Sequence, residues 1–382
     1  MTKISVITST RADFGLLKNL ILALKKSNFD SSVIASGTHF SKKYGTTANE
    51  IKQSKIKIDA KIIQKIGATN SVGVSKLMSN FISGTAKVLA KLKPDLVILL
   101  GDRYEILGSA IAAHLSRIPI AHIHGGELTN GVIDDAFRHA ITKMSQIHFV
   151  SNEIYRRRVI QLGENPKSVF TVGGMGVDSI INTDILSKKK MEKKLKIKFQ
   201  KKSLLINLHP ETLNQGFAKY QITAVLDALK ELTDTTFIFT MPGAEIENNF
   251  IINEIEKFVK INVNAFYFKS LGQINYFSIL KIVDAMIGNS SSGLLEMPTF
   301  KKATINLGNR QEGRLKSLSV LDVKIKSKEI SKAIKTIYTK SFQKKIKSCK
   351  NPYGVGGASL KILQILKKKK FKDILIKKFY DL

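Results

Sequence analysis

The chain has 382 residues, of which 43% are hydrophobic, and carries 62 Lys and Arg against 30 Asp and Glu, a formal net charge of +32. This length and apolar content are enough for two domains with buried cores. No apolar run approaches bilayer-spanning length, the N-terminus leads directly into a predicted strand, and Cys349 is the single cysteine. We therefore expect a cytoplasmic protein with no signal peptide, no transmembrane anchor and no internal disulfide.

The excess positive charge is mostly lysine, and it is clustered in runs at 188–194, 344–347 and 367–372. No arginine-rich stretch with interleaved aromatic residues, as in many nucleic-acid-binding proteins, accompanies these runs. We interpret them as solvated faces and expect neither a nucleic-acid partner nor integral membrane association. The amphipathic spacing of residues 359–378 leaves weak attraction to an acidic membrane surface open.

Short apolar segments with strand character alternate with amphipathic helical stretches. In chain order, strands are predicted at 3–9, 32–36, 95–100, 118–123, 147–151 and 168–172, and after a break at 203–208, 236–240, 265–268, 284–288 and 303–307. Helices are predicted between them, for example at 13–27, 74–92 and 221–232. This alternation predicts an α/β protein with two doubly wound, Rossmann-like domains, joined near Gly173-Gly-Met-Gly-Val-Asp178.

Polar clusters follow the predicted strands, at the carboxyl ends where open α/β sheets bind ligands. In the first half they are Thr10-Arg11-Ala-Asp13, Gly37-Thr-His39, Gly101-Asp-Arg103 and His122-Ile-His-Gly-Gly-Glu127. In the second half they are His209-Pro-Glu211, Met241-Pro-Gly243, Gly288-Asn-Ser290 and Gly308-Asn-Arg310. We expect both halves to direct these groups at one crevice, acids and histidines from the first and phosphate-binding groups from the second.

The segment Gly288-Asn-Ser-Ser-Ser-Gly-Leu-Leu-Glu296 follows a predicted strand and opens into a predicted helix. The free N–H groups of a helix N-terminus, together with small Ser and Gly residues, favour binding of a phosphate. Arg310 or Arg314, after the next strand, is placed to close on the same anion. The alternative is a serine-capped helix with solvated arginines. We favour a site for a nucleoside diphosphate.

Other ligand motifs are missing. The first strand is not followed by Gly-x-Gly-x-x-Gly, there is no Walker P-loop, and Asn-Ser-Ser-Ser-Gly lacks the flank of a Gly-x-Ser-x-Gly elbow. His122, His124 and Glu127 have a spacing that would also suit metal ligands. Because no further ligand cluster stands out, we expect no metal and no cofactor, with one of the two histidines in the core and the other lining the cleft.

A set of motifs, in order and over nearly the whole chain, resembles the hydrolysing UDP-N-acetylglucosamine 2-epimerases of sialic acid synthesis. It equally resembles their relatives that act on nucleotide-linked diacetylbacillosamine in legionaminic acid synthesis. The motifs are Thr10-Arg-Ala-Asp-Phe-Gly15, Gly101-Asp-Arg-Tyr-Glu105, His124-Gly-Gly-Glu127, Asp134-Asp-Ala-Phe-Arg-His139, His209-Pro-Glu-Thr212, Gly288-Asn-Ser-Ser-Ser-Gly293, Asn306-Leu-Gly-Asn-Arg-Gln-Glu-Gly-Arg314, and the ending Lys378-Phe-Tyr-Asp381.

The resemblance implies a two-domain, glycosyltransferase-B-like fold with the active site in the interdomain cleft. It places an N-terminal Rossmann-like domain with the catalytic acids at residues 1–175, with 357–382 packing back on it, and a nucleotide-binding domain at 176–356. It also implies a reaction on a nucleotide sugar. Anti elimination of the nucleoside diphosphate gives a 2-acetamidoglycal, and water then adds to leave the free, C2-inverted sugar. We further expect a homo-oligomer, either a dimer or a tetramer.

The same resemblance assigns roles to individual residues. The expected catalytic residues are Asp102, Glu127, Asp134, Asp135 and His209. The expected substrate-binding residues are Arg11, Gly15, Arg103, His209, Ser290, Ser291, Glu296 and Arg310. Of these, Glu296 would suit the ribose hydroxyls, and Arg310 with the two serines the diphosphate. Which carboxylate is the base and which the acid stays open, and helix capping with an ion pair to Arg138 is a structural alternative for Asp134 and Asp135.

One segment departs from the family pattern, because Gly243-Ala-Glu245 stands where relatives usually carry Asn-Ala-Asp. An asparagine there is expected to contact the nucleotide, so the sequence leaves uridine or guanosine preference open, as well as N-acetylglucosamine or diacetylbacillosamine. Two other functions also remain open. A glycosyltransferase of the same fold would leave the acids of the His-Gly-Gly-Glu and Asp-Asp motifs without a role. A non-enzymatic basic binding protein is supported by the net charge alone.

Overall fold

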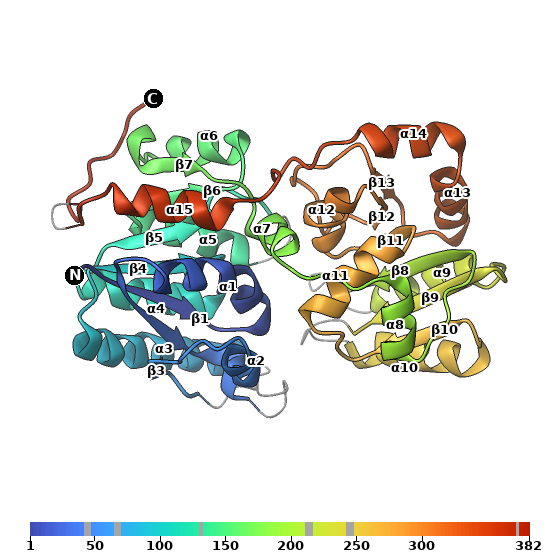
Figure 1. Ribbon diagram of the computed structural model, residues 1–382, viewed down its shortest axis with the longest axis horizontal. Helices are drawn as coiled ribbons and strands as arrows, with labels where there is room; N and C mark the ends of the chain where they lie inside the picture. The colour runs from blue at the N-terminus through green and yellow to red at the C-terminus, as the bar shows by residue number, and fades with distance from the viewer. Residues whose placement is uncertain (42–46, 65–69, 130–132, 211–216, 242–247, 372–373) are drawn as a thin grey trace. The chain divides into compact units, whose positions relative to one another are not determined.

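A computed structural model describes residues 1–41, 47–64, 70–129, 133–210, 217–241, 248–371 and 374–382 of the protein (Figure 1). Contacts divide the chain into two compact units. The first contains Met1–Glu127, Ile133–Ile181 and Tyr353–Leu382, and the second contains Leu128–Val132 and Asn182–Pro352. In the described part of the chain, no helix is long and apolar enough to cross a bilayer.

The first unit is built on a seven-stranded parallel sheet with the strand order β3-β2-β1-β4-β5-β6-β7. The strand β4, Leu-Val-Ile-Leu-Leu, is buried along its whole length, as expected for a parallel strand covered by helices on both faces. The strands are β1 (Lys3–Thr8), β2 (Asp30–Ala35), β3 (Ala60–Lys61), β4 (Leu96–Leu100), β5 (Ile120–Ile123), β6 (Ile147–Val150) and β7 (Val169–Thr171).

Alternating side chains of these strands enter two separate cores, one on each face of the sheet. Ile98 belongs to the core that also contains Phe14 of α1 and Ile362 of α15. Its neighbour Leu99 belongs to the core that contains Phe81 of α3 and Ile106 of α4. The helices are α1 (Arg11–Lys25), η1 (Gly37–Phe40), α2 (Ala48–Gln53), α3 (Ser71–Leu92), α4 (Tyr104–Leu115), α5 (Asp134–Met144), α6 (Glu153–Gln161), η3 (Pro166–Ser168), α7 (Met175–Ile181) and α15 (Ala358–Lys367).

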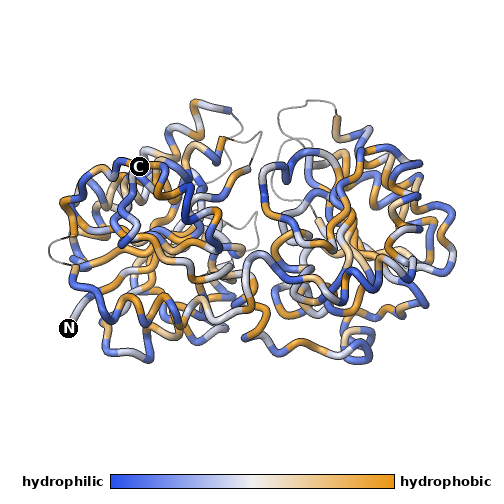
Figure 2. Tube along the Cα trace, turned by 90° about the horizontal axis from the view of Figure 1, so that it is seen from above, coloured by the Kyte–Doolittle hydropathy of each residue, from blue (hydrophilic) through white to orange (hydrophobic). Residues whose placement is uncertain are grey.

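The second unit is built on a six-stranded parallel sheet with the order β10-β9-β8-β11-β12-β13. Its strands are β8 (Lys202–Asn207), β9 (Thr235–Thr240), β10 (Ala265–Phe268), β11 (Ala285–Gly288), β12 (Ala303–Leu307) and β13 (Val320–Val323). Its helices are α8 (Lys188–Leu195), α9 (Phe217–Leu229), α10 (Asn248–Ile261), α11 (Gln273–Ile282), α12 (Ser292–Leu295), η4 (Met297–Phe300), α13 (Ser327–Ile337) and α14 (Lys340–Ser348). In each unit the strands are mainly hydrophobic and the helices and loops around them more mixed (Figure 2).

The predicted strands are present, but the sequence analysis missed the edge strands β3 and β13. The first has two residues, Ala-Lys, and the second, Val320-Leu-Asp-Val323, is only partly buried. Neither gives the continuous apolar run by which the other strands were recognised. Because all paired strands are parallel, the carboxyl ends of each sheet lie along one edge, which is where the predicted polar clusters follow.

Candidate active site

In the first unit, a buried arginine joins three of the predicted acidic segments. Arg138 of α5 has a side chain only 3% exposed, and it forms ion pairs with Asp102, which follows β4, and with Asp135 at 3.1 Å. Its Nη1 also donates to the backbone carbonyl oxygen of Glu127 at 2.7 Å. We refer to Arg138, Asp102 and Asp135 as the Arg138 cluster. Sequence reasoning gave Arg138 no role beyond an ion pair, because the contact with Asp102 depends on β4 and α5 being neighbours.

Electrostatics separates the two aspartates at the start of α5. Burial alone would lower the pKa of Arg138, but the carboxylates of Asp102, Glu127 and Asp135 raise it, so the guanidinium stays charged. Burial, with further repulsion from Asp102 and Glu105, raises the pKa of Asp134 above its ordinary value. Asp134 is therefore more easily protonated than an ordinary aspartate. The N-cap of α5 is Ile133, so neither aspartate is the capping residue, and the ion pair to Arg138 is made by Asp135.

Arg103 also forms an ion pair, in this case with Glu105 of the same motif. Its Nε and Nη2 donate to the two carboxylate oxygens of the buried Glu105 at 3.1 and 2.9 Å, a bidentate pair within the Gly-Asp-Arg-Tyr-Glu motif. The arginine side chain remains 46% exposed. A role of Arg103 in nucleotide binding stays a prediction, and Glu105 is the residue that orients its guanidinium.

The two histidines after the start of β5 have different surroundings. His122 is fully buried, and its Nε2 donates to the Gly101 carbonyl at 2.8 Å while its Nδ1 lies 3.1 Å from the Thr142 hydroxyl. Burial lowers the pKa of His122 to about 3, so the ring is neutral. With both nitrogens engaged inside the core, His122 has no ring nitrogen for a metal. Within the described ranges, no group of three His, Cys, Asp or Glu side chains could hold a metal ion.

His124 lies beside Glu127. Its Nε2 accepts a hydrogen bond from the backbone N–H of Met175 at 3.2 Å, and its Nδ1 is 3.4 Å from Glu127 Oε1. His124 also has a positive φ of 69°, which is uncommon for a residue other than glycine. The sequence raised His124 as a metal ligand or a site-lining residue, and the structure places it against a predicted catalytic acid.

The first turn of α1 carries the two remaining candidates of this unit. Thr10 and Asp13 form a capping box, which fixes the start of the helix at Arg11. The Arg11 side chain is 45% exposed and lies 3.8 Å from Glu50. The backbone carbonyl of Gly15 accepts a hydrogen bond from the Ser179 hydroxyl of α7 at 3.0 Å. Ligand binding by Arg11 and Gly15 stays a prediction.

In the second unit, Asn289 connects three strand ends. Its side chain accepts from the His209 backbone N–H at 2.7 Å and donates to the His209 carbonyl at 2.8 Å. Its own carbonyl accepts from Arg310 Nη1 at 3.1 Å and from Gln311 Nε2 at 2.8 Å. The residues that follow β8, β11 and β12 are therefore tied together. Asn289 lies inside a quoted motif, yet a sequence does not reveal which polar residue bridges which strands.

The serine-rich turn opens into a short helix. The predicted helix start is present, but α12 has only four residues, Ser292–Leu295, with Ser291 as its N-cap, so its dipole is small. The turn is nevertheless tightly built, because a Cβ on Gly288 would lie 1.9 Å from the Asn207 carbonyl oxygen. Small residues at Ser290 and Ser291 follow directly, and their backbone and hydroxyl groups can still bind an anion.

Glu296 ends the same turn. Its carboxylate accepts from the Ser292 hydroxyl at 2.6 Å, and burial raises its pKa despite that hydrogen bond. Burial of the Tyr276 hydroxyl on α11 raises the pKa of that tyrosine, and the Glu296 carboxylate adds to the shift. Sequence reasoning missed Tyr276, because it lies inside helix α11 and belongs to none of the recognised motifs. The segments Glu211-Thr212 and Gly243-Ala-Glu245 lie outside the described residues.

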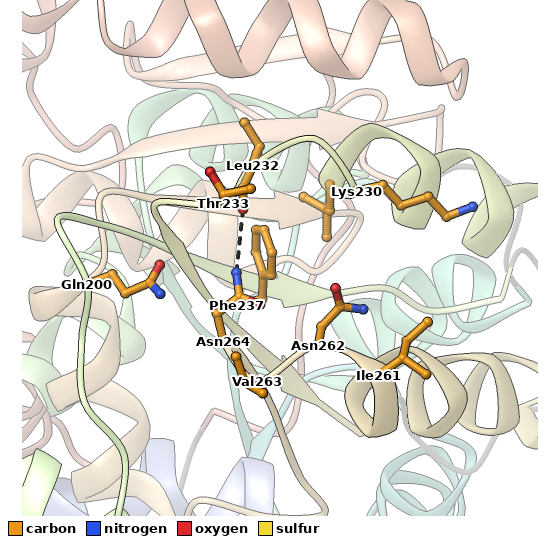
Figure 3. Close-up of a pocket in the computed structure, with 10 residues that line it drawn as sticks. Gln200, Lys230, Leu232, Thr233, Phe237, Ile261, Asn262, Val263 and Asn264 are labelled. Atoms are coloured by element: carbon orange, nitrogen blue, oxygen red, sulfur yellow. Dashed lines mark hydrogen bonds between the residues drawn. The ribbon is translucent and has the colours of Figure 1, made fainter.

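A cavity of about 270 Å³ in the second unit is a separate feature (Figure 3). Its lining residues include Leu232 and Thr233 before β9, and Asn262 and Asn264 before β10. The Asn264 side chain closes part of the wall by donating to the carbonyls of Leu232 and Thr235. The cavity thus lies at the amino ends of these strands, the opposite edge from the predicted site, and none of the predicted site residues lines it.

Comparison with known proteins agrees with this architecture. The family model described as UDP-N-acetylglucosamine 2-epimerase matches residues 22–367. The GDP/UDP-N,N'-diacetylbacillosamine 2-epimerase (hydrolyzing) of Campylobacter jejuni is 41% identical over 100% of this chain and 99% of its own length. Polysialic acid biosynthesis protein P7 of Escherichia coli is 35% identical over 100% of this chain and 98% of its own. The crystal structure of UDP-GlcNAc 2-epimerase from Neisseria meningitidis bound to UDP-GlcNAc has a TM-score of 0.83, at 22% identity over 97% of this chain and 100% of that one.

The chain belongs to the UDP-N-acetylglucosamine 2-epimerase family. It is an enzyme, and the relatives that match its whole length place it among the hydrolysing 2-epimerases, as the sequence motifs indicate. The Neisseria structure confirms the predicted fold of two Rossmann-like domains. Neither the glycosyltransferase nor the non-enzymatic binding protein has support from these relatives.

Proposed function

We propose that this enzyme converts a nucleotide-linked N,N'-diacetylbacillosamine into a nucleoside diphosphate and the free sugar inverted at C2. The support for this substrate is the 41% identity with the Campylobacter jejuni relative along the entire chain. UDP-N-acetylglucosamine is the second candidate, favoured by the description of the family itself. The observation that carries the chemistry is the gathering of Asp102, Asp135 and the Glu127 segment around one buried guanidinium.

The proposed reaction has two steps. In the first, a base removes the C2 hydrogen as a proton while the bond from C1 to the bridging oxygen breaks, which leaves a 2-acetamidoglycal and the nucleoside diphosphate. In the second, an acid delivers a proton to C2 from the opposite face, water adds its oxygen to C1, and the surplus proton of that water passes to a carboxylate. General acid–base groups typically contribute about a hundred- to ten-thousand-fold to such steps. Two carboxyl groups with opposite preferred protonation states are therefore required.

We assign the base role to Glu127 and the acid role to Asp134. The Glu127 Oε1 atom is buried and faces the ring of His124, which suits a carboxylate that accepts a proton. Burial and the neighbouring carboxylates raise the pKa of Asp134, which suits a group that delivers one. In this assignment Asp102 and Asp135 pair with Arg138 and help to hold the two active carboxyl groups in place.

We further propose that the second unit holds the nucleotide. Ser290, Ser291 and Arg310 would bind the diphosphate, and Glu296 would accept the ribose hydroxyls. The support is local, because Asn289 ties the residues after β8, β11 and β12 into one rigid group. Arg11, Gly15, Arg103 and His209 are the remaining proposed contacts. We also expect a cytoplasmic homo-oligomer, and light scattering on the purified protein will distinguish a dimer from a tetramer.

The test is turnover in deuterium oxide without any acceptor, using UDP- and GDP-linked diacetylbacillosamine and UDP-N-acetylglucosamine in parallel. We expect release of the nucleoside diphosphate and a free, C2-inverted sugar with one deuterium at C2, because the proton added in the second step comes from solvent. The highest kcat/KM is expected for a diacetylbacillosamine substrate. A product that keeps protium at C2 with unchanged configuration would contradict the elimination mechanism. A clear preference for UDP-N-acetylglucosamine would be consistent with the proposed mechanism but would contradict the proposed substrate.

A further inference from the structure

His124 is a histidine whose proton position can be assigned from its hydrogen bonds. The Met175 backbone N–H donates to Nε2 at 3.2 Å, so Nε2 carries a lone pair. A neutral imidazole with a lone pair on Nε2 carries its proton on Nδ1. That Nδ1 atom lies 3.4 Å from Glu127 Oε1, close to the carboxylate but without the geometry of a hydrogen bond. Such contacts are often long before substrate binds and shorten in the reacting complex.

The Glu127 oxygen that faces His124 has no other support in the described structure. Glu127 is 4% exposed, and its Oε1 atom is buried without a hydrogen-bond partner among the residues that the structure describes. A buried carboxylate oxygen in this position is costly unless a donor approaches it. The His124 Nδ1 atom lies 3.4 Å from this oxygen, so a small movement of either side chain brings a donor to the carboxylate.

The backbone around the two residues is held by other groups. The His124 N–H donates to the Phe149 carbonyl at 2.9 Å, Arg138 binds the Glu127 carbonyl at 2.7 Å, and Arg158 binds the Gly126 carbonyl. The turn also uses a left-handed conformation at His124, with φ of 69°. A side chain kept at such a position in spite of its conformational cost is often retained for function.

We infer that His124 is a positioning residue for Glu127, and that the Met175 backbone amide fixes the ring in the tautomer that presents Nδ1–H to the carboxylate. This inference rests on the proposed function, because it takes Glu127 as the proton acceptor in the elimination step. It adds a residue whose effect passes through Glu127 rather than through the substrate. It also means that the Met175 amide at the start of α7 helps to orient Glu127, through the ring of His124.

Four variants test the inference by kinetics with the preferred substrate. His124→Gly removes the ring and suits the positive φ, so the turn is expected to persist. Asparagine places an amide N–H near the position of Nδ1, whereas glutamine places its amide near Nε2, where it can replace only the contact with Met175. We expect His124→Gly and His124→Gln to lower kcat about ten- to a hundredfold, since hydrogen bonds to charged groups are of that size. His124→Asn is expected to recover most of the loss, with KM and product affinity nearly unchanged in all three.

The fourth variant combines His124→Gly with Glu127→Gln. If His124 acts through Glu127, the double variant has the same kcat as Glu127→Gln alone, because residues that work as a unit are not additive. Recovery by glutamine instead of asparagine, losses that multiply in the double variant, or full kcat in His124→Gly would each overturn the inference. These outcomes require an active wild-type enzyme. Failure of the proposed function is recognised separately, by wild-type protein that releases no C2-inverted sugar.

Discussion

At the scale of single residues, the candidate acids differ by their partners and not by their type. Asp102 and Asp135 are paired with Arg138, whereas the pKa of Asp134 is raised by burial and by nearby carboxylates. Two adjacent aspartates in one helical turn thus have different electrostatic surroundings. The sequence identified this Asp-Asp pair, but it left the two aspartates equivalent because only the fold places Arg138 and Asp102 beside them.

Asp134→Asn and Asp135→Asn are expected to have opposite effects on stability. A raised pKa means that ionised Asp134 is unfavourable in the native state, and this cost appears as the pH rises through its native pKa. At neutral pH, Asp134→Asn should therefore raise the unfolding temperature while turnover falls by about a hundredfold or more. Asp135→Asn should lower the unfolding temperature, since it removes an ion pair to a buried arginine.

Thermal unfolding at pH 7 and at pH 4, together with steady-state kinetics, checks this pair of variants. The stability gain of Asp134→Asn should shrink at the lower pH, because protonation of the wild-type aspartate removes the cost of its buried charge. Equal turnover in Asp134→Asn and wild type would remove Asp134 from the mechanism. Destabilisation by Asp134→Asn at pH 7 would contradict the electrostatic argument.

The two arginines after β12 are expected to differ in nucleotide binding. The sequence proposed either Arg310 or Arg314 as the diphosphate ligand. In the structure Arg314 donates to Leu128 O and to the Thr129 hydroxyl, whereas Arg310 lies on the Asn289 carbonyl next to the serine turn. We expect Arg310→Ala to weaken UDP or GDP binding by about 1.5–3 kcal/mol, the usual size of a charge-assisted contact.

Calorimetry with both nucleoside diphosphates measures this difference, and Arg314→Ala is the matched control. The control should bind either diphosphate within about 0.5 kcal/mol of wild type, the range usual for substitutions away from a site. Unchanged affinity in Arg310→Ala, or a larger loss of affinity in Arg314→Ala, would show that Arg310 is not the main ligand of the diphosphate. The nucleoside diphosphate that binds more tightly will also show whether a chain with Gly243-Ala-Glu245 prefers uridine or guanosine.

At the scale of elements, the sequence predicts strands better than it predicts short helices and edges. The fully apolar β4 and the fully buried, mainly apolar β12 were found because burial on both faces requires hydrophobic runs. The edge strands β3 and β13 were missed, because a strand with one neighbour needs little apolar sequence. The helix predicted to open after Gly288 is present as the single turn of α12, and η4 follows it from Met297, an interruption that the sequence pattern does not indicate.

The C-terminal segment shows what such patterns leave out. Its ending matches the family, and in the structure Lys377 lies 2.8 Å from each carboxylate oxygen of Glu164 and 2.8 Å from the Ser145 carbonyl. The Tyr380 N–H donates to the Gly163 carbonyl at 3.0 Å. A Cβ on Gly163 would lie 2.3 Å from the Phe379 ring, so the ring needs a glycine beneath it. The segment is thus attached to the first unit by contacts far apart in sequence.

Lys377→Ala is expected to destabilise the first unit. Burial raises the pKa of Glu164, but hydrogen bonds from His148, Lys143 and Lys377 outweigh it and bring the pKa to about 2. This stabilisation is present above the ordinary glutamate pKa and is lost as the pH falls toward 2. We expect Lys377→Ala to lower the free energy of unfolding by about 1–3 kcal/mol at pH 7, because it removes a charge-assisted contact to a buried carboxylate.

Denaturant unfolding of the intact protein measures this loss, and Lys378→Ala is the matched control because Lys378 is exposed. The difference between Lys377→Ala and the control should narrow near pH 3, as Glu164 begins to be protonated in both. Equal stability of the two variants at pH 7 would mean that the tail is held by Phe379 and backbone contacts instead of the ion pair.

At the scale of the whole molecule, the net charge of +32 is larger than any single binding site explains. The proposed site accounts for a few arginines, whereas most of the excess is lysine on the surface. A protein with a large positive net charge attracts a diphosphate from a distance, and the attraction is screened within about 10 Å at 0.1 M salt. We therefore expect the net charge to increase the rate at which the anionic substrate binds. This effect can be measured on the wild-type enzyme by varying the salt concentration.

We expect kcat/KM for the nucleotide sugar to fall about three- to tenfold as sodium chloride rises from roughly 20 to 300 mM, while kcat stays nearly constant. Salt screens the encounter between a cationic protein and an anionic substrate, but it leaves contacts inside the occupied site largely intact. Potassium chloride at equal ionic strength is the control, since screening does not depend on the cation. A kcat that falls in parallel with kcat/KM would indicate that salt disrupts the site itself, and a kcat/KM independent of salt would leave the charge without a role in substrate capture.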